Sequence, residues 1–240
     1  MGVRTVLHGL ATIHFWFGCY YDWANVNIPK EVHNRGEKWD YSGKLKYLTY
    51  WDALLQGFFF TICLLNDLIG SNEVAPKKTP FIRKVKDILL PSLAFPISFF
   101  VGATFWALYF IDRELVFPKA LDPFFPTWLN HVMHTNIMIF ILIELATSFR
   151  RYPSRKVGIS ILAVFSISYL VWIHIIHAKT GFWVYPVLEV LPTAGRIVFF
   201  VACLFMFIGF YLLGEKLNAI VWKKQLKQAP TKAQKSKKRS

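Results

Sequence analysis

The sequence has 240 residues, of which 55% are hydrophobic and only 18% are charged. Soluble domains carry roughly a quarter charged residues, so this composition excludes an ordinary soluble protein and predicts an all-α polytopic membrane protein. The formal net charge of +14 arises largely in short loops and near the C-terminus, where membrane topology accounts for it and no nucleic-acid partner is needed.

Six apolar blocks, each near the roughly 20 residues that cross a bilayer core, predict a bundle of six transmembrane helices. Their expected bounds are 5–23, 48–68, 88–110, 127–147, 157–177 and 194–214. The first block lacks a small-residue cleavage site and ends in aromatic residues, so we interpret it as a span and not as a signal peptide. In the third block, Pro91 and Pro96 predict a kink near Pro96.

Lysine and arginine are concentrated in the segments after the second and fourth blocks and after the sixth. The positive-inside rule therefore places both termini in the cytosol. We expect residues 1–222 to form one six-span domain. Residues 223–240 are rich in lysine, glutamine, alanine and serine, and they predict a basic, disordered cytosolic tail.

The fourth block carries polar side chains that are unusual in lipid. They are Asn130, His131, His134, Asn136 and Glu144. Charged residues at membrane depth cost roughly 2.5–3.5 kcal/mol each on insertion scales, so such groups indicate a functional site. The second and fourth blocks both begin on the non-cytosolic side, and Thr49 and His134 therefore lie at comparable depths.

Residue types alone leave three interpretations open. In the first, His134 activates the Thr49 hydroxyl for attack on an ester, which requires a contact of about 2.6–3.2 Å. In the second, the pair His131 and His134 joins the pair His174 and His177 in binding a metal or haem, although the two pairs are expected at different depths. In the third, these groups only hydrogen-bond between helices, at about 0.6 kcal/mol each.

Charged residues near the ends of the blocks are expected to be solvated at the membrane interface. They are Asp52, Asp67, Glu144 and Arg196. Asp52 follows Thr49 by three residues and shares its helix face. For His8 the sequence indicates no partner.

Short motifs run through the chain from the second block onward. They include Tyr47-Leu48-Thr49, Leu93-Ala94-Phe95-Pro96, Phe105-Trp106, Asp112-Arg113-Glu114, Trp128-Leu129-Asn130-His131, Met133-His134-Thr135, Tyr152-Pro153-Ser154, Trp183-Val184-Tyr185-Pro186 and Tyr211-Leu212-Leu213-Gly214-Glu215. In this order they resemble the androgen-induced gene one family of membrane proteins.

This resemblance implies an intramembrane hydrolase of fatty acid esters of hydroxy fatty acids, with Thr49 as nucleophile, His134 as base and no metal or other cofactor. The lipid substrate would diffuse in from the bilayer of the plasma membrane or the endoplasmic reticulum. Asn130 and His131 are nearby candidates to stabilise an oxyanion. The chain departs from the family at Leu45, where relatives often have tryptophan. The alternative is a non-enzymatic signalling or scaffold membrane protein.

Overall fold

The computed structural model describes residues 2–29, 32 and 41–228, and this part of the chain is helical without any strand. Five helical segments are long and apolar enough to cross a membrane. They are Leu48–Ile69, Phe81–Leu115, Thr127–Thr147, Arg155–Thr180 and Thr193–Val221. The predicted all-α, polytopic membrane fold is therefore confirmed.

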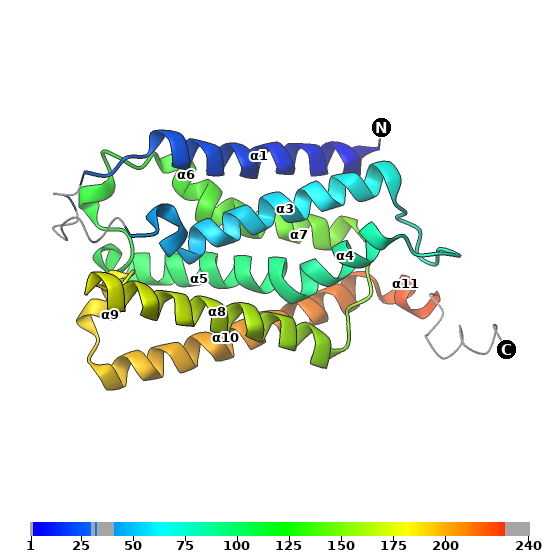
Figure 1. Ribbon diagram of the computed structural model, residues 1–240. Helices are drawn as coiled ribbons and strands as arrows, with labels where there is room; N and C mark the ends of the chain where they lie inside the picture. The colour runs from blue at the N-terminus through cyan, green and yellow to red at the C-terminus, as the bar shows by residue number, and fades with distance from the viewer. Residues whose placement is uncertain (1, 30–31, 33–40, 229–240) are drawn as a thin grey trace.

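Consecutive membrane-spanning helices alternate in direction along a common bundle axis, so that α3 and the segment Thr127–Thr147 run parallel to each other (Figure 1). The long ones are α1 (Val3–Asn25), α3 (Leu48–Ile69), α5 (Phe95–Asp112), α7 (Ile137–Thr147), α8 (Arg155–Thr180) and α10 (Thr193–Val221). The short ones are η2 (Gly43–Lys46), α4 (Phe81–Leu89), η3 (Leu90–Ala94), η4 (Arg113–Leu115), η5 (Lys119–Leu121), α6 (Thr127–His131), η6 (Val132–Asn136), α9 (Pro186–Val190) and α11 (Lys223–Gln228).

Helix α1 packs lengthwise against α3 at the edge of the bundle (Figure 1). Its 23 residues are long enough to span a bilayer, but they include Arg4, His8, His14 and Asp22, and α1 is not among the five strongly apolar segments. The sixth span therefore stays a prediction.

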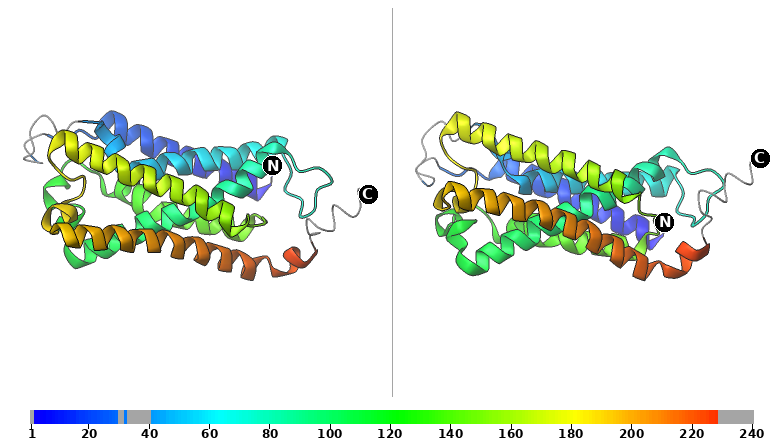
Figure 2. Two further views of the ribbon diagram at one scale, coloured as in Figure 1. Left: turned by 60° about the horizontal axis from the view of Figure 1, so that its bottom comes forward. Right: turned by 90° about the horizontal axis from the view of Figure 1, so that it is seen from below.

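The first turn of α1 and helix α11 lie at the same end of the bundle, as an even number of passes requires (Figures 1 and 2). The cytosolic location of that end stays a prediction. Helix α11 extends helical structure six residues into the segment assigned to the tail. The rest of that segment, 229–240, lies outside the described residues.

Two of the membrane-spanning segments contain a π-helical turn. One is η3, which links α4 to α5 and contains Pro91, with Pro96 just after it. Proline lacks the N–H that an α-helix needs, so a wider turn at Pro91 is understandable, and the kink expected near Pro96 stays a prediction. The other is η6, in the middle of the segment Thr127–Thr147. Single π turns inside α-helices are frequent at functional sites, and η6 contains His134.

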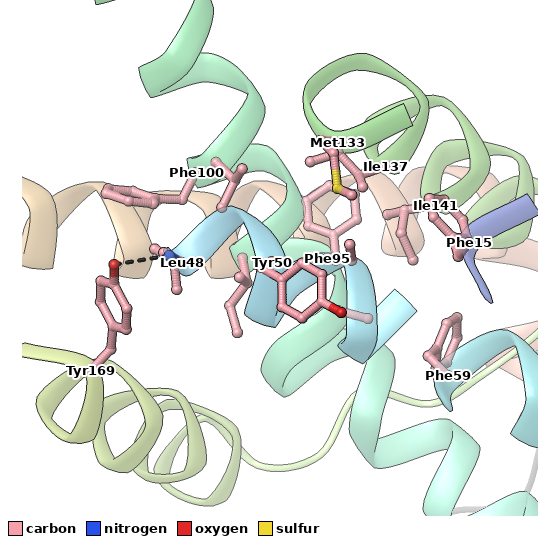
Figure 3. Packing of buried hydrophobic residues seen from close by; sticks show 14 of the residues in the cluster. Phe15, Leu48, Tyr50, Phe59, Phe95, Phe100, Met133, Ile137, Ile141 and Tyr169 are labelled. Carbon is pink, nitrogen blue, oxygen red and sulfur yellow. Dashed lines mark hydrogen bonds between the residues drawn. The ribbon is translucent and has the colours of Figure 1, made fainter. Parts of the chain in front are cut away.

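The core lies between α1, α3, α5 and α7, where large apolar side chains interlock (Figure 3). Phe15, Phe59, Phe95, Ile137 and Ile141 are fully buried there. On the other side of α5, helices α8 and α10 cover the bundle (Figure 2). This packing holds α3 and the α6–η6–α7 segment side by side, and these two segments carry the candidate site.

Candidate active site

Thr49 is the second residue of α3, and its Oγ1 lies 3.3 Å from Nε2 of His134. This contact differs from those of four other threonine hydroxyls in the helices. Those of Thr12, Thr61, Thr147 and Thr180 each donate to the carbonyl four residues earlier. At the start of a helix no such intrahelical carbonyl is in place, so the Thr49 hydroxyl is available to the imidazole.

The His134 ring is held by two contacts. Its Nδ1 lies 3.0 Å from the carbonyl oxygen of Asn130, and its face stacks on the Phe105 ring with centroids 3.5 Å apart. A carbonyl oxygen can only accept, so Nδ1 carries the proton, and in the neutral ring Nε2 presents its lone pair toward Thr49. This is the arrangement that a general base needs to take the hydroxyl proton. Hydroxyl–imidazole contacts in substrate-free enzymes are often longer than in the reacting complex.

A glycine lets α5 approach the turn that carries His134. A Cβ on Gly102 would lie 2.6 Å from the carbonyl oxygen of His134 and equally close to the Met138 side chain. No side chain fits at that distance, so only glycine permits this helix spacing. The close approach brings Phe105, three residues later on α5, against the imidazole.

Thr49 lines two cavities. The larger, about 770 Å³, is lined by both Thr49 and His134 and extends to the loops at the end of the bundle where α3 begins. Its lining includes the charged side chains of Asp22, Lys44 and Lys46. The smaller, about 110 Å³, lies between α5, α8 and α10, and no charged side chain lines it.

Two tyrosine hydroxyls contact the backbone N–H of Leu48, the residue before Thr49. The Leu48 N–H donates to both Tyr169 Oη, at 2.8 Å, and Tyr185 Oη, at 2.9 Å, and the first of these bonds is drawn in Figure 3. Tyr169 donates its own proton to the Lys46 carbonyl at 2.9 Å. The contact of 2.9 Å between the two hydroxyls therefore takes its proton from Tyr185. Burial raises the pKa of Tyr185 to about 12, so this hydroxyl keeps its proton at neutral pH.

Tyr185 also lines both cavities, together with Thr49 and Phe105. Sequence reasoning gave it no role, although it belongs to the motif 183–186. The two donors considered from the sequence lie elsewhere. Asn130 lines neither cavity, and His131 is exposed, with Nδ1 3.1 Å from Thr135 Oγ1.

Asp52 is fully buried, which corrects the expectation that it is solvated at the membrane interface. It accepts a hydrogen bond of 2.7 Å from Gln56 Nε2, one turn further along α3. It is covered because α5 and η3 pack over this part of α3. The group that orients the imidazole is the backbone carbonyl of Asn130, whereas the Asp52 carboxylate pairs with Gln56.

The two histidine pairs considered as metal ligands lie apart. His174 and His177 both pack against Trp183, with ring centroids 5.2 and 4.1 Å away, whereas His134 packs against Phe105 on α5. Within the described residues, the one group with metal-ligand spacing is His8, Cys63 and Glu144.

That group belongs to an ion-pair network at the opposite end of the bundle. His8 Nδ1 lies 2.8 Å from Asp67 and its Nε2 lies 2.7 Å from Glu144, while Glu144 also pairs with the buried Arg150. Glu144 and the Asp67 carboxylate are buried, so the expected interfacial solvation is wrong for both. The sequence offered no signal for His8 because its partners lie 59 and 136 residues away.

Comparison with known proteins gives consistent matches along the chain. The family model described as FAR-17a/AIG1-like protein matches residues 3–219. The human androgen-induced gene 1 protein is 42% identical over 191 residues, which cover 77% of this chain and 80% of the relative. The mouse androgen-dependent TFPI-regulating protein is 40% identical over 211 residues, covering 87% and 91%.

A more distant relative, a membrane protein of Schizosaccharomyces pombe, is 25% identical over 198 residues, which cover 81% of each chain. No solved structure matches. The name of the yeast relative agrees with the five apolar spans, and the protein is an integral membrane protein.

Proposed function

Because the chain belongs to the FAR-17a/AIG1-like family, we propose that it is an intramembrane hydrolase in which Thr49 is the nucleophile and His134 the base. The observation that carries this proposal is the contact of 3.3 Å between Thr49 Oγ1 and His134 Nε2 inside a cavity large enough for a lipid. A hydroxyl beside an oriented imidazole is the common arrangement for nucleophilic catalysis on esters.

The reaction proceeds through an acyl-threonine. His134 Nε2 takes the proton of Thr49 while Oγ1 attacks the ester carbonyl, and the imidazolium then protonates the leaving alkoxide as the ester C–O bond breaks. Water next attacks the acyl-threonine, giving one proton to His134 and its oxygen to the acyl carbon. The proton returns to Thr49 Oγ1 as the fatty acid leaves.

The oxyanion that forms in each attack needs hydrogen-bond donors in place. We assign this role to the Tyr185 hydroxyl and to the Thr49 N–H. Tyr185 lines both cavities, and the proton that it donates to Tyr169 Oη in the substrate-free structure would turn to the oxyanion, while Tyr169 keeps its own bond to the Lys46 carbonyl. The Thr49 N–H lies in the first turn of α3, where N–H groups have no partner within the helix and favour negative charge.

The substrates are fatty acid esters of hydroxy fatty acids, taken from the surrounding bilayer of the plasma membrane or endoplasmic reticulum. This class follows from the resemblance set out above, and both cavities suit it. No cofactor enters the reaction, because the hydroxyl, the imidazole and water supply every proton transfer.

An active-site probe tests the proposal. A fluorophosphonate reagent should label the wild-type protein in membranes, and labelling should disappear in Thr49→Ala. In His134→Ala the rate should fall by roughly 10²–10⁴, the usual contribution of a general base. Matched controls are Thr147→Ala and His131→Ala, whose side chains are exposed and away from the cavities. Full ester hydrolysis by Thr49→Ala would point to another nucleophile, whereas a wild-type protein that neither reacts with the probe nor hydrolyses the ester would favour the non-enzymatic signalling or scaffold role.

A further inference from the structure

The smaller cavity has the properties of a site for a single hydrocarbon chain. It lies between α5, α8 and α10, and apolar side chains dominate its wall. They include Leu108, Ile173, Phe199, Phe200 and Leu204. A carboxylate buried here would lose its hydration without a compensating partner, which is strongly unfavourable.

The two halves of the proposed substrate differ in this respect. The hydroxy-acid half carries a free carboxylate, whereas the acyl half is hydrocarbon up to the ester carbonyl. The larger cavity is lined by Lys44, whose Nζ lies 2.9 Å from Asp22, and by other polar groups near the loops. The polar lining therefore favours the hydroxy-acid half in the larger cavity, and the apolar lining favours the acyl half in the smaller.

Two stacked aromatic rings close the inner end of the smaller cavity. Phe100 of α5 and Phe207 of α10 lie with centroids 4.0 Å apart and planes 21° from parallel, and each is 7% exposed. Phe100 precedes Phe105, the residue at the level of His134, by five positions, which places the stack about 7.5 Å deeper. An extended chain advances roughly 1.2 Å per bond, so about six bonds fit between Thr49 and the stack.

We propose that this cavity binds the acyl chain of the ester, and that the Phe100–Phe207 stack determines which chain lengths are accepted. The proposal rests on the function proposed above. It means that the acyl chain stays in place in the acyl-threonine while the hydroxy acid departs through the larger cavity. A chain longer than the cavity must bend at the stack or displace the Phe207 ring.

Shortening Phe207 tests this directly. In Phe207→Ala the inner end opens, and each further buried methylene contributes a factor of about 4 to binding. With a series of p-nitrophenyl esters from butanoate to hexadecanoate, we expect kcat/KM for long relative to medium chains to rise about tenfold. The matched control is Phe205→Ala on the same helix, whose side chain is 70% exposed and whose profile should equal that of the wild type.

A second series of esters keeps the acyl chain constant and varies only the hydroxy-acid half. The dependence of kcat/KM on the hydroxy-acid half should be the same in Phe207→Ala as in the wild type. An unchanged acyl profile, or a shift in the hydroxy-acid series instead, overturns the proposal. If Phe207→Ala does not fold, Phe207→Leu gives a smaller shift in the same direction.

Binding without catalysis separates this proposal from the hydrolase proposal. Saturated fatty acids of increasing length should raise the melting temperature of Thr49→Ala, and the preferred length should increase when Phe207→Ala is added. Length-dependent stabilisation together with a wild-type protein that hydrolyses no ester would refute the hydrolase and leave a fatty-acid site. Thr49-dependent hydrolysis with no effect of Phe207 would refute the acyl cavity alone.

Discussion

Replacing Tyr185 by phenylalanine removes one hydroxyl from the wall shared by the two cavities and keeps the ring. The N-terminus of α3 retains a partner, because the Leu48 N–H still donates to Tyr169 Oη at 2.8 Å. Tyr169 still donates to the Lys46 carbonyl. The structural loss is therefore two hydrogen bonds, from Leu48 N–H to Tyr185 Oη and from Tyr185 Oη to Tyr169 Oη, or roughly 2 kcal/mol of folding free energy.

The expected catalytic loss is larger than the structural one. Removing a single oxyanion donor lowers kcat by about 10²–10³, or roughly 2.7–4 kcal/mol of transition-state stabilisation. Because the Tyr185 hydroxyl is assigned to the oxyanion and not to the ground-state ester, KM should change little. The Thr49 N–H remains as the second donor, so activity should fall without disappearing.

The assay is steady-state hydrolysis of one lipid ester by wild type and Tyr185→Phe in detergent, with melting temperatures measured on the same samples. Tyr152→Phe is the matched control. Its hydroxyl is buried near Gly214, toward the opposite end of the bundle and away from both cavities. Wild-type kcat in Tyr185→Phe, or a loss that appears only in KM, would refute the assignment.

Three further predictions concern the surroundings of the site. Gly102→Ala should lower kcat at least tenfold, because the added Cβ pushes α5 away from the turn that carries His134. The control is Gly209→Ala, where an added Cβ meets nothing within 4 Å, and equal activity of the two variants would contradict the prediction. His8→Ala should reduce the free energy of unfolding by about 3 kcal/mol in thermal denaturation, because two hydrogen bonds to buried carboxylates are lost. Since the raised pKa of Tyr185 keeps the donor protonated, the kcat profile should show no tyrosine-dependent fall up to about pH 10.

Hydrophobic patterning predicted the long helices well, because membrane spans are specified by length and apolar content within each segment. The start of α3 one residue before Thr49 and the segment Thr127–Thr147 agree with the predicted blocks. Patterning was less informative for α1, which is helical from Val3 to Asn25 but whose polar residues keep it outside the strongly apolar class.

Residue spacing placed Thr49 and His134 at comparable depths but left their contact open. The contact depends on features that lie more than 50 residues from Thr49 in the sequence: the π turn at 132–136, the missing side chain at Gly102 and the ring of Phe105. Each acts through packing between helices, which a single sequence does not specify. Tyr185 was missed for the same reason, since it reaches the Leu48 N–H across 137 residues.

Polar residues of the spans make contacts at both ends of one pair of neighbouring helices, α3 and the segment Thr127–Thr147. Helix α3 carries Thr49 at its start and Asp67 roughly 27 Å further along, and the Thr127–Thr147 segment carries His134 and, about 15 Å further, Glu144. His8 of α1 joins Asp67 to Glu144, so the two helices are linked by the ion-pair network at one end and by the contact between Thr49 and His134 at the other. Inside a bilayer no hydrophobic force holds helices together, and packing and polar contacts set their spacing. Placing the polar side chain of His8 in α1 has a cost in free energy. That cost is offset because His8 fixes the position of α3 relative to the segment Thr127–Thr147. The distance between Thr49 and His134 depends on this relative position.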